Sequence, residues 1–280
     1  MNSLSYSGEQ VRLYDHDRFM TAIFAPAAVR EHLLALYAFN IELAKVREIV
    51  SEPLIGRMRL QWWRDTLDRL YAGETIAHEV ARSLGTAIAA GGIARAAFDP
   101  LIDAREFDLE PTPPADLQAM LAYAEGTGAP VIGLALQIAG DGSNATAAEV
   151  ARLVGTGWAL TGLLRAVPFH ARQHRLYLPA DMLDGAGVRT GRLFDLKPEP
   201  GLCDVVHTIG ERAQANLTAA RKLVRNLPRA GRSPALLIEI GQLYLGDLQS
   251  AGWDPLVLEK RPQRRFTAAR LALAAILKGY

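Results

Sequence analysis

The chain has 280 residues, of which 50% are hydrophobic and 22% are charged, and its formal net charge is +1 at pH 7. This composition is typical of a globular protein that buries a substantial core, and the near-neutral charge gives no reason to expect nucleic acid as a partner. The single cysteine, Cys203, excludes an intramolecular disulfide and a cysteine-based zinc site, and it fits a reducing interior.

Three segments of the sequence bear on where the protein is located in the cell. Residues 1–15 contain no basic segment followed by an apolar run, so they do not read as a secretory signal, and we treat them as open to flexibility. The longest nearly apolar stretch, residues 129–140, is about half of the ~20 residues that a membrane-spanning helix needs. The amphipathic segment 266–278 has basic flanks and reads as a helix docked on a bundle, with attachment to a membrane surface as the alternative. We therefore expect a cytoplasmic protein with at most peripheral contact with the inner membrane.

Apolar residues recur at spacings of three and four through most of the chain, and no segment keeps a period of two, which predicts an all-α protein. A first helix is expected from Pro26 to Glu48 and a second from Pro53 to Gly73, in which Trp62 and Trp63 cannot both face inward. Ser233 is predicted to cap the helix that starts at Pro234. The other expected helices cover residues 77–90, 93–107, 114–125, 128–139, 145–166, 202–227, 234–249 and 264–277. Turn residues lie between these helices and no shift in composition divides them, so we predict one domain over residues 1–280.

The segment Leu36-Tyr-Ala-Phe-Asn-Ile-Glu-Leu-Ala-Lys-Val-Arg-Glu48 resembles the first aspartate-rich signature of the squalene/phytoene synthase family. The apolar lead-in of that signature is kept. The paired aspartates are not, because Ala44 and Lys45 stand at their positions, and Glu48 stands at the last acidic position.

Residues 157–179 resemble the second aspartate-rich signature of the same family. Ala166, Phe169 and His170 stand where that signature has acidic residues. Pro168 replaces a glycine of the family and predicts that the helix kinks or stops near Ala166, which would leave His170 on a loop. The positions that match are Leu160, Thr161, Leu164, Arg165, Val167, Ala171, Arg172, Arg175, Tyr177, Leu178 and Pro179.

The resemblance covers about residues 17–278 and implies an antiparallel helical bundle of the isoprenoid synthase type with a central cavity. Synthases of this family hold Mg²⁺ between facing helices through carboxylates, and the metal stabilises the departing diphosphate. Glu48, with Glu42 as the other acid in reach, cannot hold several such ions. We therefore assign no catalytic residue, expect no metal ligand beyond Glu48 and expect no cofactor, with Mg²⁺ only if the chain is an active synthase.

The basic residues of the two signatures offer a different way to bind an anion. Lys45, Arg165, Arg172 and Arg175, with Tyr177, are candidates to hold a diphosphate or a lipid head group directly. The alternative is that Arg165 and Arg172 pair with nearby carboxylates and cap helix ends.

Three segments, residues 39–52, 56–65 and 164–170, resemble the branch of the family that contains the mitochondrial respiratory complex I assembly factor and its bacterial relatives. That resemblance implies a pseudoenzyme without prenyl-transfer activity, whose partners are subunits of respiratory complex I or an isoprenoid or other lipid. Two alternatives stay open: an active prenyltransferase that condenses isoprenyl diphosphates head to head, and an isoprenoid-diphosphate carrier without a complex I role.

Overall fold

The computed structural model describes residues 4–50, 52–140, 144–260 and 271–273, and these residues contain helices and no strand. The α-helices are α1 (Tyr6–Tyr14), α2 (His16–Ile23), α3 (Ala27–Ala44), α4 (Val46–Ile49), α5 (Pro53–Tyr71), α6 (Glu79–Gly91), α7 (Asp99–Arg105), α8 (Leu117–Ile138), α9 (Ala145–Arg165), α10 (Val167–Arg172), α11 (Ala180–Gly185), α12 (Thr190–Phe194), α13 (Pro200–Val224), α14 (Leu237–Ser250) and α15 (Pro255–Glu259). Four short 3₁₀ helices are η1 (Arg95–Phe98), η2 (Glu106–Leu109), η3 (Arg229–Gly231) and η4 (Ser233–Leu236). The predicted all-α fold is confirmed.

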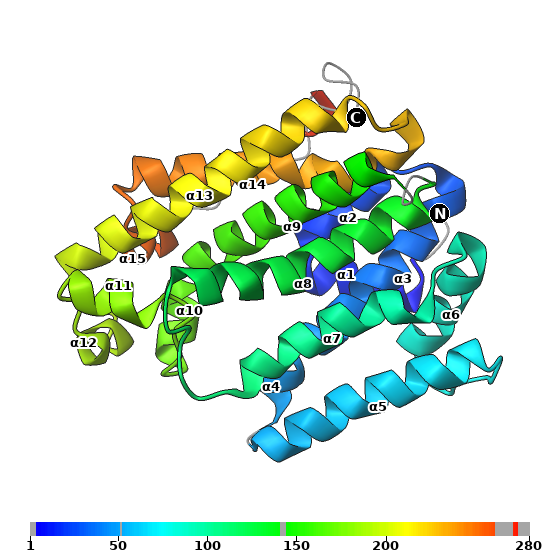
Figure 1. The fold of residues 1–280 in the computed structure, drawn as a ribbon, viewed down its shortest axis with the longest axis horizontal. Helices are drawn as coiled ribbons and strands as arrows, with labels where there is room; N and C mark the ends of the chain where they lie inside the picture. Colours follow the sequence, from blue (N-terminus) through cyan, green and yellow to red (C-terminus); the bar gives the residue numbers. More distant parts are fainter. Residues whose placement is uncertain (1–3, 51, 141–143, 261–270, 274–280) are drawn as a thin grey trace.

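The long helices α8, α9 and α13 lie side by side through the middle of the molecule, with α3 and α7 next to α8 and with α5 at the edge (Figure 1). The side chain of Asp116 accepts a hydrogen bond from the Ala119 amide at 2.8 Å and caps α8, and Asn144 caps α9 in the same way through Ala147 at 2.8 Å. Gly128 and Gly155 face each other where α8 and α9 cross, and a Cβ atom on either one would overlap the backbone of the other helix. The two glycines therefore permit the close approach of the helices that form the centre of the bundle.

Two clusters of buried apolar side chains form the core. One gathers α9, α13 and α14, and the other gathers α3, α5, α6 and α7. Helix α8 supplies Ile132 and Leu136 to the first cluster and Val131 and Leu134 to the second. Among the described helices, α8 alone is long and apolar enough to cross a membrane, and more than half of its most apolar stretch is buried inside the bundle. Its position between two cores accounts for its apolar composition.

Several sequence expectations need correction. Two helices were expected over residues 114–139, but α8 runs without a break through Pro130. Proline removes one backbone hydrogen bond from the helix. Packing against α9 on one side and against α3 and α7 on the other holds this turn in place. Ser233 does not cap a helix: it lies inside η4, and its buried Oγ has no hydrogen-bond partner among the described residues. The helix expected from Pro26 to Glu48 breaks at Lys45.

Three further expectations concern the tryptophan pair and the two ends of the chain. Trp63 is 3% exposed and Trp62 is 41% exposed, so the prediction that they face different ways is confirmed. Residues 6–14, within the segment left open to flexibility, form α1, which packs against α3 and α6. The helix expected over residues 264–277 lies mostly outside the described residues.

Candidate functional site

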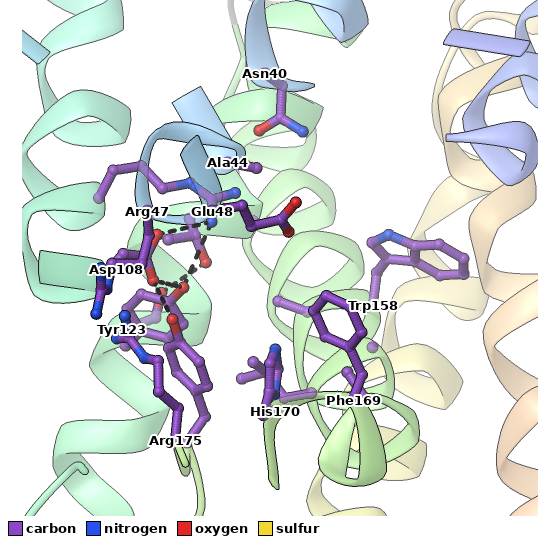
Figure 2. Close-up of a pocket in the computed structure, with 18 of the residues that line it drawn as sticks. Asn40, Ala44, Arg47, Glu48, Asp108, Tyr123, Trp158, Phe169, His170 and Arg175 are labelled. Carbon is purple, nitrogen blue, oxygen red and sulfur yellow. Dashed lines mark hydrogen bonds and ion pairs between the residues drawn. The ribbon is translucent and has the colours of Figure 1, made fainter. Parts of the chain in front are cut away.

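A cavity of about 270 Å³ opens where the break between α3 and α4 meets η2, α8, α9 and α10. Figure 2 shows Asn40 and Glu48 on one side of it, His170 and Phe169 on another, and Trp158 across from the cluster of Asp108 and Tyr123. The described residues that line the cavity are Arg18, Asn40, Ala44, Arg47, Glu48, Arg105, Asp108, Tyr123, Thr127, Gly128, Trp158, Ala159, Gly162, Leu163, Ala166, Phe169, His170, Gln173, Arg175 and Tyr177.

The first signature reaches the cavity through Ala44 and Glu48. Lys45 does not line it, because the chain turns at this residue and the ammonium group lies 2.8 Å from the centre of the Tyr14 ring. Partial burial lowers the pKa of Lys45, against the attraction of Glu42 and Glu48. The amine that the sequence offered as an anion ligand therefore packs on an aromatic ring of α1.

The second signature reaches the cavity through Ala166, Phe169 and His170. Helix α9 ends at Arg165 and α10 starts at Val167 with Pro168 in its first turn, so the predicted break near Ala166 is confirmed. The expectation that His170 lies on a loop is wrong. Proline is tolerated in the first turn of a helix, so it starts α10 here, and that helix directs His170 at the cavity.

The candidate anion ligands separate into two groups. Arg175 and Tyr177 line the cavity, whereas Arg165 and Arg172 do not. The Arg165 guanidinium stacks 3.4 Å from the centre of the Tyr244 ring. Arg172 donates two hydrogen bonds of 2.6 Å to the carboxylate of Glu259, which is the pairing that the alternative interpretation expected.

Asp108 on η2 is the centre of a buried hydrogen-bond network that sequence reasoning missed. Its Oδ1 accepts hydrogen bonds from the hydroxyls of Tyr123 at 2.6 Å and Tyr177 at 2.8 Å, and Arg105 donates to Oδ2 at 3.2 Å. Burial and the nearby carboxylate raise the pKa of both tyrosines, so both remain neutral donors. The signal in the sequence was the spacing of three between Arg105 and Asp108, which brings a cation and an anion within one helical turn of each other.

His170 stays neutral in this setting. Burial lowers its pKa to about 4, and the positive charge of Arg175 acts in the same direction while Asp108 opposes it. Its ring lies 4.6 Å from the ring of Tyr177. The residue at this acidic position of the family signature therefore contributes neither a carboxylate nor a positive charge at neutral pH.

The residues of the cavity do not fit the magnesium cluster of a prenyl synthase. Glu48 and Asp108 are the carboxylates among the described lining residues, and Asp108 already binds two hydroxyls and a guanidinium. Within the described part of the chain, no group of three or more His, Cys, Asp or Glu side chains could hold a metal ion. Mg²⁺ prefers oxygen ligands in near-octahedral geometry, which Ala44, Ala166 and a neutral imidazole do not supply.

The helical bundle, its cavity and the two signature segments that line it together define a class of protein, the isoprenoid synthase type. The sequence profile described as squalene/phytoene synthase matches residues 11–270. The chain belongs to the squalene/phytoene synthase family.

Individual relatives point to two branches of that family. The chain is 30% identical over 269 residues to the NADH dehydrogenase (ubiquinone) complex I, assembly factor 6 of Bos taurus, with 96% of this chain and 80% of the relative covered. It is 28% identical over 253 residues to the presqualene diphosphate synthase of Rhodopseudomonas palustris, with 89% of this chain and 88% of the relative covered. The fold is similar to that of squalene synthase HpnC from Alicyclobacillus acidocaldarius, with a TM-score of 0.77, 21% identity, and coverage of 89% of this chain and 94% of that one.

Proposed function

We propose that this protein is a family member without prenyl-transfer activity that assists the assembly of respiratory complex I, and that its cavity holds an isoprenoid or another lipid. The observation that carries the proposal is the replacement of acidic signature positions by Ala44, Ala166, Phe169 and His170, all of which line the cavity. The similarity to complex I assembly factor 6 over 96% of the chain supplies the assembly role.

The chemistry of the family explains why those positions matter. Head-to-head condensation begins when a diphosphate leaves an allylic carbon, and the negative charge that develops on it must be stabilised. Glu48 alone among the acidic signature positions presents a carboxylate to this cavity. The site therefore supports binding better than turnover.

A role in complex I assembly implies where in the cell the protein acts. An assembly factor for complex I works next to the membrane that carries this complex, which fits a protein on the inner-membrane surface rather than one that spans it. Subunits of complex I are the proposed protein partners.

Two measurements test the proposal. Deletion of the gene in its own organism is expected to reduce assembled complex I on native gels, with normal polyprenyl products, and re-expression is expected to restore assembly. The purified chain, given farnesyl diphosphate and Mg²⁺, is expected to release no pyrophosphate. Mg²⁺-dependent release of pyrophosphate that Glu48→Ala abolishes would instead identify an active prenyltransferase. The similarity to presqualene diphosphate synthase favours that alternative function.

A further inference from the structure

Large apolar side chains gather on the outer side of α5. Leu54, Ile55, Met58 and Trp62 are between 41% and 64% exposed, and Ile49 on α4 is 52% exposed shortly before them. Leu54, Met58 and Trp62 are spaced by four residues, so they follow one line along the helix, and Ile55 lies beside that line. We call these four residues of α5 the α5 face. A cluster of exposed apolar side chains of this kind usually marks a contact site.

No described element covers the α5 face. Helix α5 lies at the edge of the molecule and buries its other side, with Leu60, Trp63 and Leu67, against its neighbours in the bundle (Figure 1). Leu271, near the end of the described chain, packs in the cluster of α9, α13 and α14, on the far side of the bundle. The α5 face is therefore an outer surface of the bundle within the described part of the chain.

Trp62 is held in place at this surface. Its ring makes edge-to-face contacts with the rings of Trp63 and His78, with centres 4.9 Å and 5.3 Å apart. The indole is therefore presented with little conformational freedom left to lose on binding. Tryptophan is enriched where an apolar phase meets water, because its ring is apolar and its N–H is polar.

Arginines flank the α5 face on both sides. Arg59 follows Ile55 by one turn on one side, and Arg57 lies on the other side. The ion pair of Arg57 with Glu110 is 3.4 Å long and exposed at both side chains, and Arg59 forms no ion pair within the described residues. An exposed pair of this kind contributes little to stability, so both guanidinium groups are available to a binding partner.

The charge around the α5 face is positive. Residues 45–62 contain four basic and two acidic side chains, a net charge of +2 in a chain whose net charge is +1. The acids do not interrupt the face: Glu48 lines the cavity and Glu52 precedes α5. Asp65 lies further along the helix and accepts a hydrogen bond from Gln61 at 2.7 Å. The partner that complements this surface is apolar at its centre and anionic around it.

We infer that the α5 face docks on the surface of a bilayer that contains anionic phospholipids, with Arg57 and Arg59 contacting the lipid phosphates. An interfacial helix buries its apolar side chains at the boundary of head groups and acyl chains, and basic residues beside them attract anionic lipids. Long arginine side chains reach the phosphates while their stems stay on the apolar surface.

The shape and charge of α5 favour a bilayer over a second copy of the chain. A helix that protrudes at the edge of the molecule fits a flat lipid surface. Two copies paired through Met58 about a two-fold axis would place the same arginine-bearing flanks next to each other, and like charges oppose that contact. The inference deepens the proposed place of action and rests on it only for which membrane is bound.

Co-sedimentation of the full-length protein with vesicles is the experiment. Binding to vesicles of phosphatidylcholine and phosphatidylglycerol is expected to exceed binding to phosphatidylcholine alone and to weaken with salt. Met58→Glu is expected to weaken binding at least about tenfold, because it removes an inserted apolar group and adds a repelled charge. Val257→Glu, which places the same charge on an exposed apolar residue of α15, is the matched control and is expected to bind as the wild type does.

Two further readouts locate the contact. Arg57→Gln and Arg59→Gln are each expected to weaken binding about fivefold, the contribution of one basic residue near an anionic surface. Brominated lipids are expected to quench the tryptophan fluorescence of the wild type, and Trp62→Phe is expected to lose this quenching while it still sediments with the vesicles. All these side chains are exposed, and circular dichroism checks that each variant keeps the helical fold.

Four outcomes would overturn the inference. The first is equal binding to neutral and anionic vesicles, and the second is equal loss of binding in Met58→Glu and Val257→Glu. The third is a lipid-free dimer in ultracentrifugation that Met58→Glu dissociates, which would assign the α5 face to a second copy. The fourth is absence of vesicle binding together with loss of assembled complex I in cells that carry Met58→Glu, which would assign the face to a protein partner. Failure of the proposed assembly role is distinguishable, since it appears as normal complex I after gene deletion and leaves the vesicle result unchanged.

Discussion

At the scale of single residues, the site shows how a charged group is defined by its neighbours. Lys45 and Arg47 are two positions apart, yet Lys45 packs on Tyr14 while Arg47 lines the cavity. Arg172 and Arg175 divide in the same way, because Glu259 holds the first and the second faces the cavity. The sequence analysis named Arg175 and Tyr177, which line the cavity, and did not name Arg47, which also lines it because α4 starts after the helix break at Lys45.

His170 offers a test at this scale. Its ring protons are expected to titrate in an NMR experiment with a pKa of about 4 instead of 6.5. Because the folded-state pKa lies below the unfolded value, protonation favours the unfolded chain, so its contribution to stability is present above about pH 6.5 and is lost as the pH falls toward 4. The loss amounts to about 3 kcal/mol at most, from ~1.4 kcal/mol for each pKa unit.

His170→Gln serves as the control, since a neutral amide does not titrate. Its free energy of unfolding is expected to fall less between pH 6.5 and pH 4 than that of the wild-type protein. A wild-type ring that titrates near 6.5 would contradict the burial argument.

At the scale of helices, the crossing of α8 and α9 positions both walls of the cavity. Tyr123 and Thr127 come from α8, and Trp158 and Leu163 come from α9. The distance between the two walls depends on Gly128 and Gly155, which let the two backbones touch. No local pattern in the sequence shows that these two glycines face each other.

Gly155→Ala tests this contact. The added methyl group would overlap the backbone of Gly128 and Ala129, so we expect the free energy of unfolding to fall by about 2–3 kcal/mol, as for overpacked cores. Gly246→Ala on α14 is the matched control, because no atom lies within 4 Å of the added carbon. Its higher helix propensity is expected to stabilise the protein by up to about 1 kcal/mol. Equal effects of the two changes in chemical denaturation would show that the crossing is not tight.

At the scale of the whole molecule, the two clusters of buried residues share α8, and the cavity lies where elements of both meet. Loss of one cluster exposes apolar side chains of α8 and removes a wall of the other. The two halves are therefore expected to unfold together, although chains of this length often populate intermediates.

Two single-tryptophan variants test that expectation. One keeps Trp63, which is buried in the cluster of α3 and α5, and the other keeps Trp158, which packs against the cluster of α9 and α13. Their fluorescence midpoints in denaturant are expected to coincide with each other and with the loss of helical circular dichroism. Separate midpoints would mean that α8 does not couple the two halves.

The sequence by itself determined the all-α class, the family signatures and the missing acids, because apolar periodicity and residue identity are local properties of the chain. Only the tertiary structure decided which cations face the cavity and that Asp108 joins Tyr123 and Tyr177. The pairs that settle these points are far apart in sequence, as with Asp108 and Tyr177 or Arg172 and Glu259. The direction of a side chain after a helix break depends on such contacts, and no local pattern encodes them.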